Sequence, residues 1–301
     1  MRIITLGTGA GRPTAQRLTS ASALEYEGEV LLFDCGEGVQ LQLIRSPLHW
    51  GKMRAIFIGH LHGDHLYGLP GLLGTLSLMD RSEPLRLFGP PGLKEYLEVQ
   101  RKIHSLWIRF PLEIQEIHEA GVLWTTENYS VSAAPLEHTI TCWGYVFQEK
   151  PRAGRFDAAK AEALGIPDGP LRGRLVQGET VDLPDGRRIS PETLVGPRRP
   201  GRRVAYCLDT RPCRGARELA EGADLVLHEA TFGCDMQSDA TQWGHSTAAD
   251  AGRLAREAGA KRLILTHISQ RYMEAQVLLD EAQREFAATE LASDLAQFFL
   301  S

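Results

Sequence analysis

The residues with the clearest potential for chemistry are crowded into one short stretch, Gly-His-Leu-His-Gly-Asp-His at 59–65. Three of the chain's 10 histidines, His60, His62 and His65, fall here beside Asp64. Neutral imidazole nitrogens and carboxylate oxygens are good ligands for zinc and similar divalent ions. His60 and His62 point the same way in an extended loop, and Asp64 and His65 then reach a second ion. A polar loop with histidines placed by chance is the alternative, and it does not explain this concentration.

The elements around this stretch are those that a metal site needs. Residues 54–58 are apolar and β-branched, which predicts a buried strand, and Gly59 allows a sharp turn after it. Strands are also expected at 129–133, 204–208, 225–227 and 262–265. Active sites of α/β folds gather at the carboxyl ends of such strands. The polar residues that follow them are candidates for one shared site between two sheets: His138, Asp209, Glu229 and His267.

Single residues within this set are weaker indicators than the cluster. A lone histidine such as His138 is usually structural, but a closed metal pair needs ligands from elsewhere in the chain. Asp34 ends a strand at 29–33, where its carboxylate can orient a metal-bound histidine or can be an ordinary turn acid. Two further expectations concern helices: one helix over 66–78 behind the metal loop, and a helix at 247–258 with Ser246 as its N-cap.

Residues 150–203 break the strand-and-helix pattern with many glycines, prolines and arginines. Within them, 165–175 is too rich in Gly and Pro for a core element, so we expect an arm that projects from the body. Basic residues on such an arm suit a phosphate backbone. A solvated insertion loop is the alternative. The arginines concerned are Arg152, Arg155, Arg172, Arg174, Arg187, Arg188, Arg198, Arg199, Arg202 and Arg203.

The bulk composition limits the classes of function. Hydrophobic residues make up 43% and charged residues 24% of the 301 residues, as in a soluble globular protein. The net charge of −5 means that a nucleic-acid function needs local basic patches. Five scattered cysteines indicate reduced thiols, and the start has no signal-peptide layout, so we expect a cytoplasmic protein. No apolar run is long enough for a membrane span.

HxHxDH is the signature of the metallo-β-lactamase superfamily, and nearly the whole chain resembles one branch of it, the ribonuclease Z family. The resemblance rests on the LGTGAGxPT opening, FDxGEG at 33–38, LDT at 208–210, HEAT at 228–231, GHST at 244–247 and THISQRY at 266–272. It implies an α/β fold, a four-layer αββα sandwich. It also implies one domain over 1–301, with an inserted, flexible arm at 151–180 that binds tRNA.

The resemblance also implies a site with two zinc ions per subunit, with manganese or another divalent ion as an alternative. His60, His62 and His138 would hold one ion; Asp64, His65 and His267 would hold the other. Asp209 would bridge the ions, and Asp34 would orient a metal-bound histidine without contacting the metal itself. For catalysis, we expect Asp64 to orient the attacking water and His245, held by Glu229, to protonate the leaving group.

The activity that the family implies is removal of the 3′ trailer from precursor tRNA, leaving a tRNA 3′-OH and a trailer 5′-phosphate. The expected partners are precursor tRNA and a second copy of the chain in a homodimer. The expected tRNA contacts are Arg17, Gly169, Pro170, Arg172 and Arg174.

One loop departs from the family pattern. In the resembled family the loop after the first glycines commonly reads PxKxRN, helps to read the nucleotides just after the cleavage point and rejects tRNA that already ends in CCA. Here Pro13-Thr14-Ala15-Gln16-Arg17-Leu18 lacks the lysine and the asparagine, so we expect weaker discrimination against precursors that carry CCA. Two other readings stay open. One is another metal-dependent phosphodiesterase or thioester hydrolase on the same fold, for which loss of the arm would be harmless. The other is a nucleic-acid-binding protein on a disabled scaffold, against which the complete ligand set argues.

Overall fold

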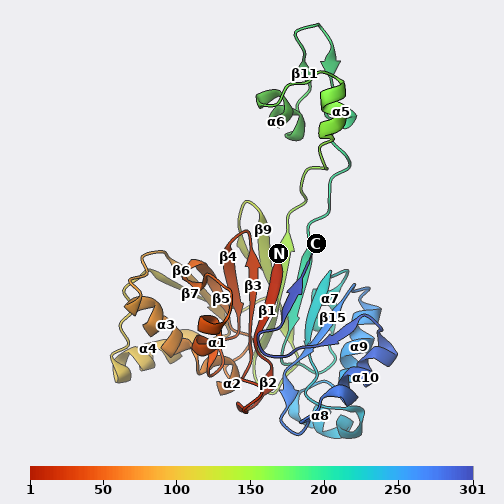
Figure 1. The fold of residues 1–301 in the computed structure, drawn as a ribbon. Helices are drawn as coiled ribbons and strands as arrows, with labels where there is room; N and C mark the ends of the chain where they lie inside the picture. Colours follow the sequence, from red (N-terminus) through yellow and green to blue (C-terminus); the bar gives the residue numbers. More distant parts are fainter. Residues whose placement is uncertain (301) are drawn as a thin grey trace. The chain divides into compact units, whose positions relative to one another are not determined.

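The computed structural model describes residues 1–300 and divides them into two compact units. The first unit comprises residues 1–125, 131–147 and 203–300, and the second comprises 126–130 and 148–202. Figure 1 shows both, coloured along the chain. None of the described helices combines the length and the apolar composition needed to cross a lipid bilayer.

The first unit contains two seven-stranded sheets. The first sheet has the order β18-β1-β3-β4-β5-β6-β7 and the second the order β17-β15-β14-β13-β10-β9-β8. The first consists of β18 (Gln297–Phe299), β1 (Arg2–Gly7), β3 (Ala21–Tyr26), β4 (Glu29–Phe33), β5 (Met53–Phe57), β6 (Leu85–Gly89) and β7 (Leu112–Glu116). The second consists of β17 (Thr289–Leu291), β15 (Leu263–Thr266), β14 (Leu225–Glu229), β13 (Arg203–Cys207), β10 (Cys142–Glu149), β9 (Tyr129–Leu136) and β8 (Gly121–Thr125).

Aromatic side chains join the two sheets. Phe33 stacks on Tyr206 with ring centroids 5.4 Å apart, and Phe57 contacts Tyr145 at 5.3 Å. All four side chains are buried. The hydroxyl of Tyr145 also donates a hydrogen bond of 2.6 Å to the carbonyl of Ile58, directly after β5. The interface between the sheets therefore fixes the position where the metal loop begins.

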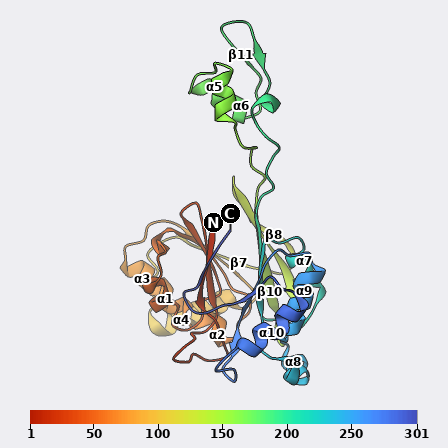
Figure 2. The ribbon, with the colours of Figure 1, turned by 45° about the vertical axis from the view of Figure 1, so that its right-hand side comes forward.

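Helices cover the outer face of each sheet, as Figures 1 and 2 show. α1 (Val39–Arg45), α3 (Leu69–Leu78) and α4 (Leu93–His104) share a leucine-rich core with the first sheet. α7 (Arg214–Ala220), α9 (Ala248–Glu257) and α10 (Gln276–Glu285) share an alanine-rich core with the second. A Cβ at Gly252 of α9 would lie 2.6 Å from the carbonyl oxygen of Ala282, so glycine allows α9 and α10 to pack closely. The predicted αββα sandwich is confirmed.

The helix predicted at 66–78 is confirmed over most of its length as α3, but it begins at Leu69, and Leu66 instead ends the short helix α2 (Gly63–Leu66). Gly68, between the two helices, packs so closely that a Cβ there would lie 2.2 Å from the carbonyl oxygen of Gly36. The predicted N-cap of the helix at 247–258 was wrong. The N-cap of α9 is Thr247, whose hydroxyl and main-chain N–H form a capping box with Asp250. The Ser246 hydroxyl donates a hydrogen bond to the Thr210 carbonyl at 2.6 Å.

The second unit has its own small core, contrary to the expectation for 165–175. α6 (Pro170–Val176) falls almost wholly in this range and buries Leu175. α5 (Ala158–Ala163), the short strands β11 (Val181–Asp182) and β12 (Arg188–Ile189), and the turn Pro191–Thr193 complete the unit. Its buried apolar residues include Val181, Leu183, Ile189 and Leu194, so the folded insertion is longer than the predicted 151–180.

A buried carboxylate holds together the two chain segments at the ends of this insertion. Glu149 is 2% exposed and accepts hydrogen bonds from the guanidinium groups of Arg152 and Arg202. Arg152 and Arg199 also exchange two main-chain hydrogen bonds of 3.0 Å, as in an antiparallel strand pair. The two ends of the insertion therefore run side by side within the second unit.

Candidate metal centre

Three histidines from two sheets form the first cluster of candidate ligands. His60 and His62 lie in the loop after β5, and His138 follows β9. His60 Nε2 lies 3.0 Å from His62 Nδ1, which lies 3.2 Å from His138 Nε2. The structure thus brings together the three residues expected to hold the first ion.

The second cluster lies beside the first. His65 Nε2 is 3.2 Å from His267 Nε2, and Asp64 Oδ2 lies 3.3 Å from His267 Nε2. Asp209, two residues after the end of β13, places Oδ2 at 3.3 Å from His65 Nε2 and at 3.7 Å from His60 Nε2. This oxygen therefore reaches both clusters, which is the position that a bridging ligand needs.

Hydrogen bonds on the far side of three rings fix which nitrogen faces the cluster. Nδ1 of His65 donates to Asp34 Oδ2 at 2.7 Å, and Nδ1 of His138 donates to the Gly244 carbonyl at 2.8 Å. Nδ1 of His267 lies 2.9 Å from the hydroxyl of Thr231, which donates its own proton to Glu229 at 2.7 Å. In neutral rings these contacts leave the Nε2 lone pair directed into the cluster.

The donor set fits divalent cations. Lone pairs on facing nitrogens about 3 Å apart repel one another unless positive charge lies between them. Burial alone would lower the pKa of His65, but the carboxylates of Asp209, Asp34 and Asp64 outweigh it and raise that pKa well above its ordinary value. Asp209 Oδ1 is buried without a hydrogen-bond partner among the described residues. The site therefore attracts positive charge, and bound ions would supply it.

Backbone conformation and a glycine-rich loop complete the placement of the ligands. His267 and Asp34 both have positive φ, 55° and 57°, a left-handed conformation that is uncommon for such residues. Ile268–Ser269 (β16) pairs with Gly9–Ala10 (β2), which brings the first loop beside His267. There the main-chain N–H of Gly11 donates to Asp64 Oδ2 at 2.7 Å. An amide of this loop thus positions a candidate ligand.

His245 and Glu229 lie together at the same centre. His245 Nδ1 is 3.0 Å from Glu229 Oε1, and Glu229 is fully buried. Burial would lower the pKa of His245, but the Glu229 carboxylate outweighs it and raises that pKa to about 9. The imidazole is therefore held in one orientation and tends to carry a proton at neutral pH.

A cavity of about 490 Å³ opens over the candidate ligands. His62, Asp64, His138, Asp209, His245 and His267 all line it. Its remaining wall includes Gly11 from the first loop, Trp243 at the end of α8 (Gln237–Trp243) and Arg271 from the loop after β16. The cavity therefore combines a charged, ligand-rich floor with an aromatic ring and a guanidinium on its walls.

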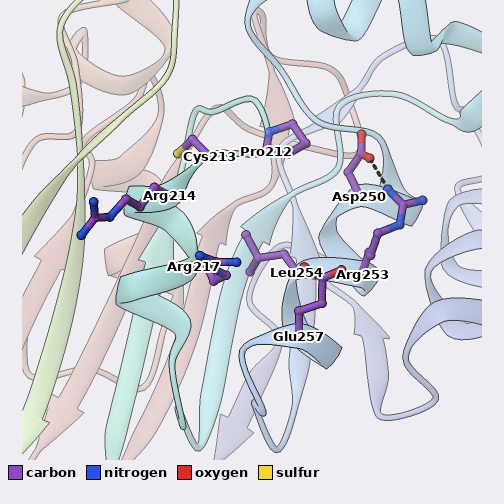
Figure 3. Close-up of a pocket in the computed structure, with 8 residues that line it drawn as sticks. All are labelled: Pro212, Cys213, Arg214, Arg217, Asp250, Arg253, Leu254 and Glu257. Carbon is purple, nitrogen blue, oxygen red and sulfur yellow. Dashed lines mark hydrogen bonds and ion pairs between the residues drawn. The ribbon is translucent and has the colours of Figure 1, made fainter.

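Another cavity, of about 330 Å³, is lined by residues at the start of α7 and by residues of α9. Arg253 pairs with Asp250 in its wall at 2.9 Å, as the dashed line in Figure 3 shows. Arg214, also in this wall, pairs with Glu218 at 2.5 Å. The lining contains none of the candidate metal ligands, so this cavity is separate from the site.

The residues expected to contact tRNA are partly engaged within the protein. The Arg17 guanidinium donates to the Thr8 hydroxyl at 2.7 Å and to the Ala292 carbonyl at 2.8 Å. Gly169, Pro170, Arg172 and Arg174 belong to the second unit. There, Arg172 binds the Ile166 carbonyl at 2.7 Å, and Arg174 pairs with Glu179 at 2.7 Å. Their tRNA contacts remain predictions.

Sequence reasoning missed several groups that hold the site in place. Thr231 lies in the HEAT motif, which was a usable signal. The hydroxyl of Tyr206 donates to Asp34 at 2.7 Å, and its place near the end of a strand gave no such signal. The Gly11 amide and the Gly244 carbonyl are main-chain groups, whose partners only the fold reveals.

Comparison with known proteins places this geometry in a family. Residues 187–268 match the model of the beta-lactamase superfamily domain, and residues 1–104 match that of the anti-Pycsar protein Apyc1. The crystal structure of human tRNase Z, short form, superposes with a TM-score of 0.75 at 30% identity, covering 100% of each chain. A two-sheet sandwich with histidine and aspartate clusters at its strand ends is the metallo-β-lactamase fold.

Sequence relatives give the particular family. A ribonuclease Z from Salinibacter ruber is 46% identical over 99% of this chain and 94% of its own length. A ribonuclease BN from Escherichia coli is 44% identical over 99% of each protein. The chain belongs to the ribonuclease Z family.

Proposed function

We propose that this protein is a metal-dependent endoribonuclease that removes the 3′ trailer from precursor tRNA. The observation that carries this proposal is the pair of ligand clusters around Asp209, in a chain related to ribonuclease Z along nearly its whole length. Two zinc ions would be held there, one by His60, His62 and His138 and one by Asp64, His65 and His267, with Asp209 between them. When bound, such ions lower the pKa of a water to about 7 and offset charge on the phosphate.

The chain's own residues would then move the protons. Asp64, oriented by the Gly11 amide, would orient the attacking water and accept its proton. His245, oriented by Glu229, would donate a proton to the departing 3′ oxygen. Water adds to phosphorus and the P–O3′ bond breaks, which leaves a tRNA 3′-OH and a trailer 5′-phosphate.

The direct test uses a 3′-extended tRNA precursor with and without a chelator, and reads the chemistry of both new ends. We expect metal-dependent cleavage, about two zinc-type ions per chain, and no cleavage by Asp64→Ala. A product with a 3′-phosphate would contradict the assigned direction of bond breakage. A metal content at or below one ion per metal-replete chain would contradict the bridging role of Asp209.

We further propose that the second unit, which contains none of the candidate metal ligands, grips tRNA. Arg155 and Arg198 are exposed and have no ion-pair partner among the described residues, so their charges are available for phosphate. Because Arg152 and Arg199 already pair, residues 153–198 can be replaced by Asn-Gly as a two-residue hairpin turn. We expect this deletion to cripple tRNA processing while sparing a small phosphodiester. The double substitution Arg155→Glu with Arg198→Glu is the matched variant: it changes only exposed charges, so the unit stays folded, and we expect the same selective loss of tRNA processing.

A homodimer is the remaining family expectation that we propose here. α1, α3 and α4 bury one set of apolar side chains against the first sheet but leave another set of large apolar side chains exposed. These are Leu41, Ile44, Leu78, Val99 and Ile103, with exposed fractions of 43 to 81%. Apolar exposure of this extent on one layer suits a subunit interface. Sedimentation of wild type and Ile44→Glu would test it, and a tRNA-processing role would place the dimer in the cytoplasm.

A further inference from the structure

Trp243 is the large aromatic side chain in the wall of the cavity over the metal centre. It is 56% exposed, although it lines the same cavity as five candidate ligands and His245. The described residues give its indole neither a ring contact nor a hydrogen-bond partner. A single exposed tryptophan on a protein surface needs no explanation. One that faces the reacting centre with its ring unoccupied offers a contact to whatever binds there.

The backbone beneath this indole is held firmly. Trp243 ends α8, and Gly244 caps that helix in a left-handed conformation with φ of 77°. A Cβ at Gly244 would lie 2.9 Å from His138 Nδ1, so the chain passes directly against a candidate ligand. The Gly244 carbonyl accepts the His138 hydrogen bond, and the His245 N–H binds the Ala240 carbonyl at 2.8 Å. The ring is therefore carried on the same short segment that orients His138 and presents His245.

The chemistry of the substrate indicates what this ring contacts. The phosphate to be cut lies between two nucleotides, and the bases of a single-stranded 3′ end are unpaired. Unpaired bases stack on exposed aromatic side chains and on guanidinium planes. Arg271 lines the same cavity, and its side chain is exposed. Phe232, by contrast, is 7% exposed and packs against His245, so its ring is already engaged.

We propose that Trp243 is a base-stacking platform for a nucleotide that flanks the scissile phosphate. This inference rests on the proposed function. Stacking fixes the base without reading its hydrogen-bonding edge, so it positions the phosphate over the ligands for any sequence. Its loss is expected to lower kcat/KM about 5- to 150-fold.

The test is a double-mutant cycle between protein and RNA. Wild type, Trp243→Ala and Trp243→Phe cleave three precursors: the intact one, one abasic just before the cleaved bond, and one abasic just after it. We expect Trp243→Ala to lower kcat/KM about 5- to 150-fold on intact RNA, and less than twofold on one of the abasic RNAs. Trp243→Phe keeps a ring and should fall between wild type and Trp243→Ala. Metal content and melting temperature of each variant serve as controls for folding.

Other outcomes separate this inference from the proposed function. An equal loss by Trp243→Ala on all three precursors, or no loss on any, overturns the stacking platform while cleavage by wild type still supports the nuclease. Reduced metal content in Trp243→Ala would instead make the residue a support for His138, which also overturns the platform. Failure of wild type to cleave the intact precursor refutes the nuclease and, with it, this role of Trp243.

Discussion

The hydrogen bond between Asp34 and His65 allows the sharpest test of how the metal centre is built. Asp34 is fully buried and accepts three hydrogen bonds of 2.7 Å, from His65 Nδ1, the Tyr206 hydroxyl and the Gly59 N–H. We consider the substitution Asp34→Asn, which preserves size and shape. An asparagine has one accepting oxygen and one donating NH₂ group. Three donors converge on this side chain, so its NH₂ group must face at least one of them.

Each orientation of the amide has a definite cost. If its oxygen stays on Gly59, the NH₂ group faces His65 Nδ1, and the ring must move its proton to Nε2. Nε2 is the atom directed at Asp209 and His267, so a metal ion loses its lone pair. If the amide flips, a buried N–H of Gly59 loses its acceptor, at about 1–3 kcal/mol. Either cost agrees with the 10- to 100-fold loss of metal affinity typical of such supporting residues.

The assay is stepwise competition for zinc between the protein and a chromophoric chelator. For Asp34→Asn we expect about 10- to 100-fold weaker binding of one ion and little change for the other, because His60, His62 and His138 do not contact Asp34. Tyr206→Phe is the matched control: it removes one donor to the same carboxylate but leaves the hydrogen bond from His65. We therefore expect it to weaken zinc binding less than threefold. Wild-type affinity for both ions in Asp34→Asn would refute the tautomer argument. An equal loss in Tyr206→Phe would assign the effect to packing.

Three further predictions follow from other contacts. Thr231→Val should weaken zinc binding by about 10-fold, because the hydroxyl that orients His267 is lost, whereas Thr231→Ser should restore it; equal affinities would show that the hydroxyl is dispensable. Burial would raise the pKa of Asp250, but hydrogen bonds from Thr247 outweigh it and lower that pKa. The ionised carboxylate therefore stabilises the folded state at pH values above its ordinary pKa of about 4, and this stabilisation is lost at more acid pH. Acid unfolding of Asp250→Asn should therefore lack about 0.5–2 kcal/mol of the pH-dependent stability of wild type. Finally, Ala15→Lys introduced together with Leu18→Asn should raise the ratio of kcat/KM on CCA-less precursors to kcat/KM on CCA-bearing precursors by about 10- to 100-fold. An unchanged ratio would show that this loop does not recognise CCA.

The sequence was most informative where ligands are concentrated or follow apolar strands. HxHxDH and the polar residues after 204–208 and 262–265 were identifiable because strand ends meet at one edge of a sheet. The cap of α9 was misassigned by one position, because Ser246 and Thr247 have equivalent side chains and only the fold directs Ser246 to Thr210. The helix in the insertion was missed because Pro170 begins it and Gly173 lies on its open side, where neither residue disrupts packing.

The pairing of the chain's two ends has a consequence for how the protein forms during synthesis. β1 lies between β3 and β18, with Arg2 opposite Phe299, and the Leu300 N–H donates to the Met1 carbonyl at 3.0 Å. β1 therefore keeps one open edge until β18 has been translated, although its other neighbour, β3, follows it closely in the sequence. Unpaired strand edges recruit other strands, so nascent chains on one messenger are exposed to mispairing at this edge of β1 until β18 emerges. Emergence of β18, rather than of any strand before it, is the event that pairs the second edge of β1.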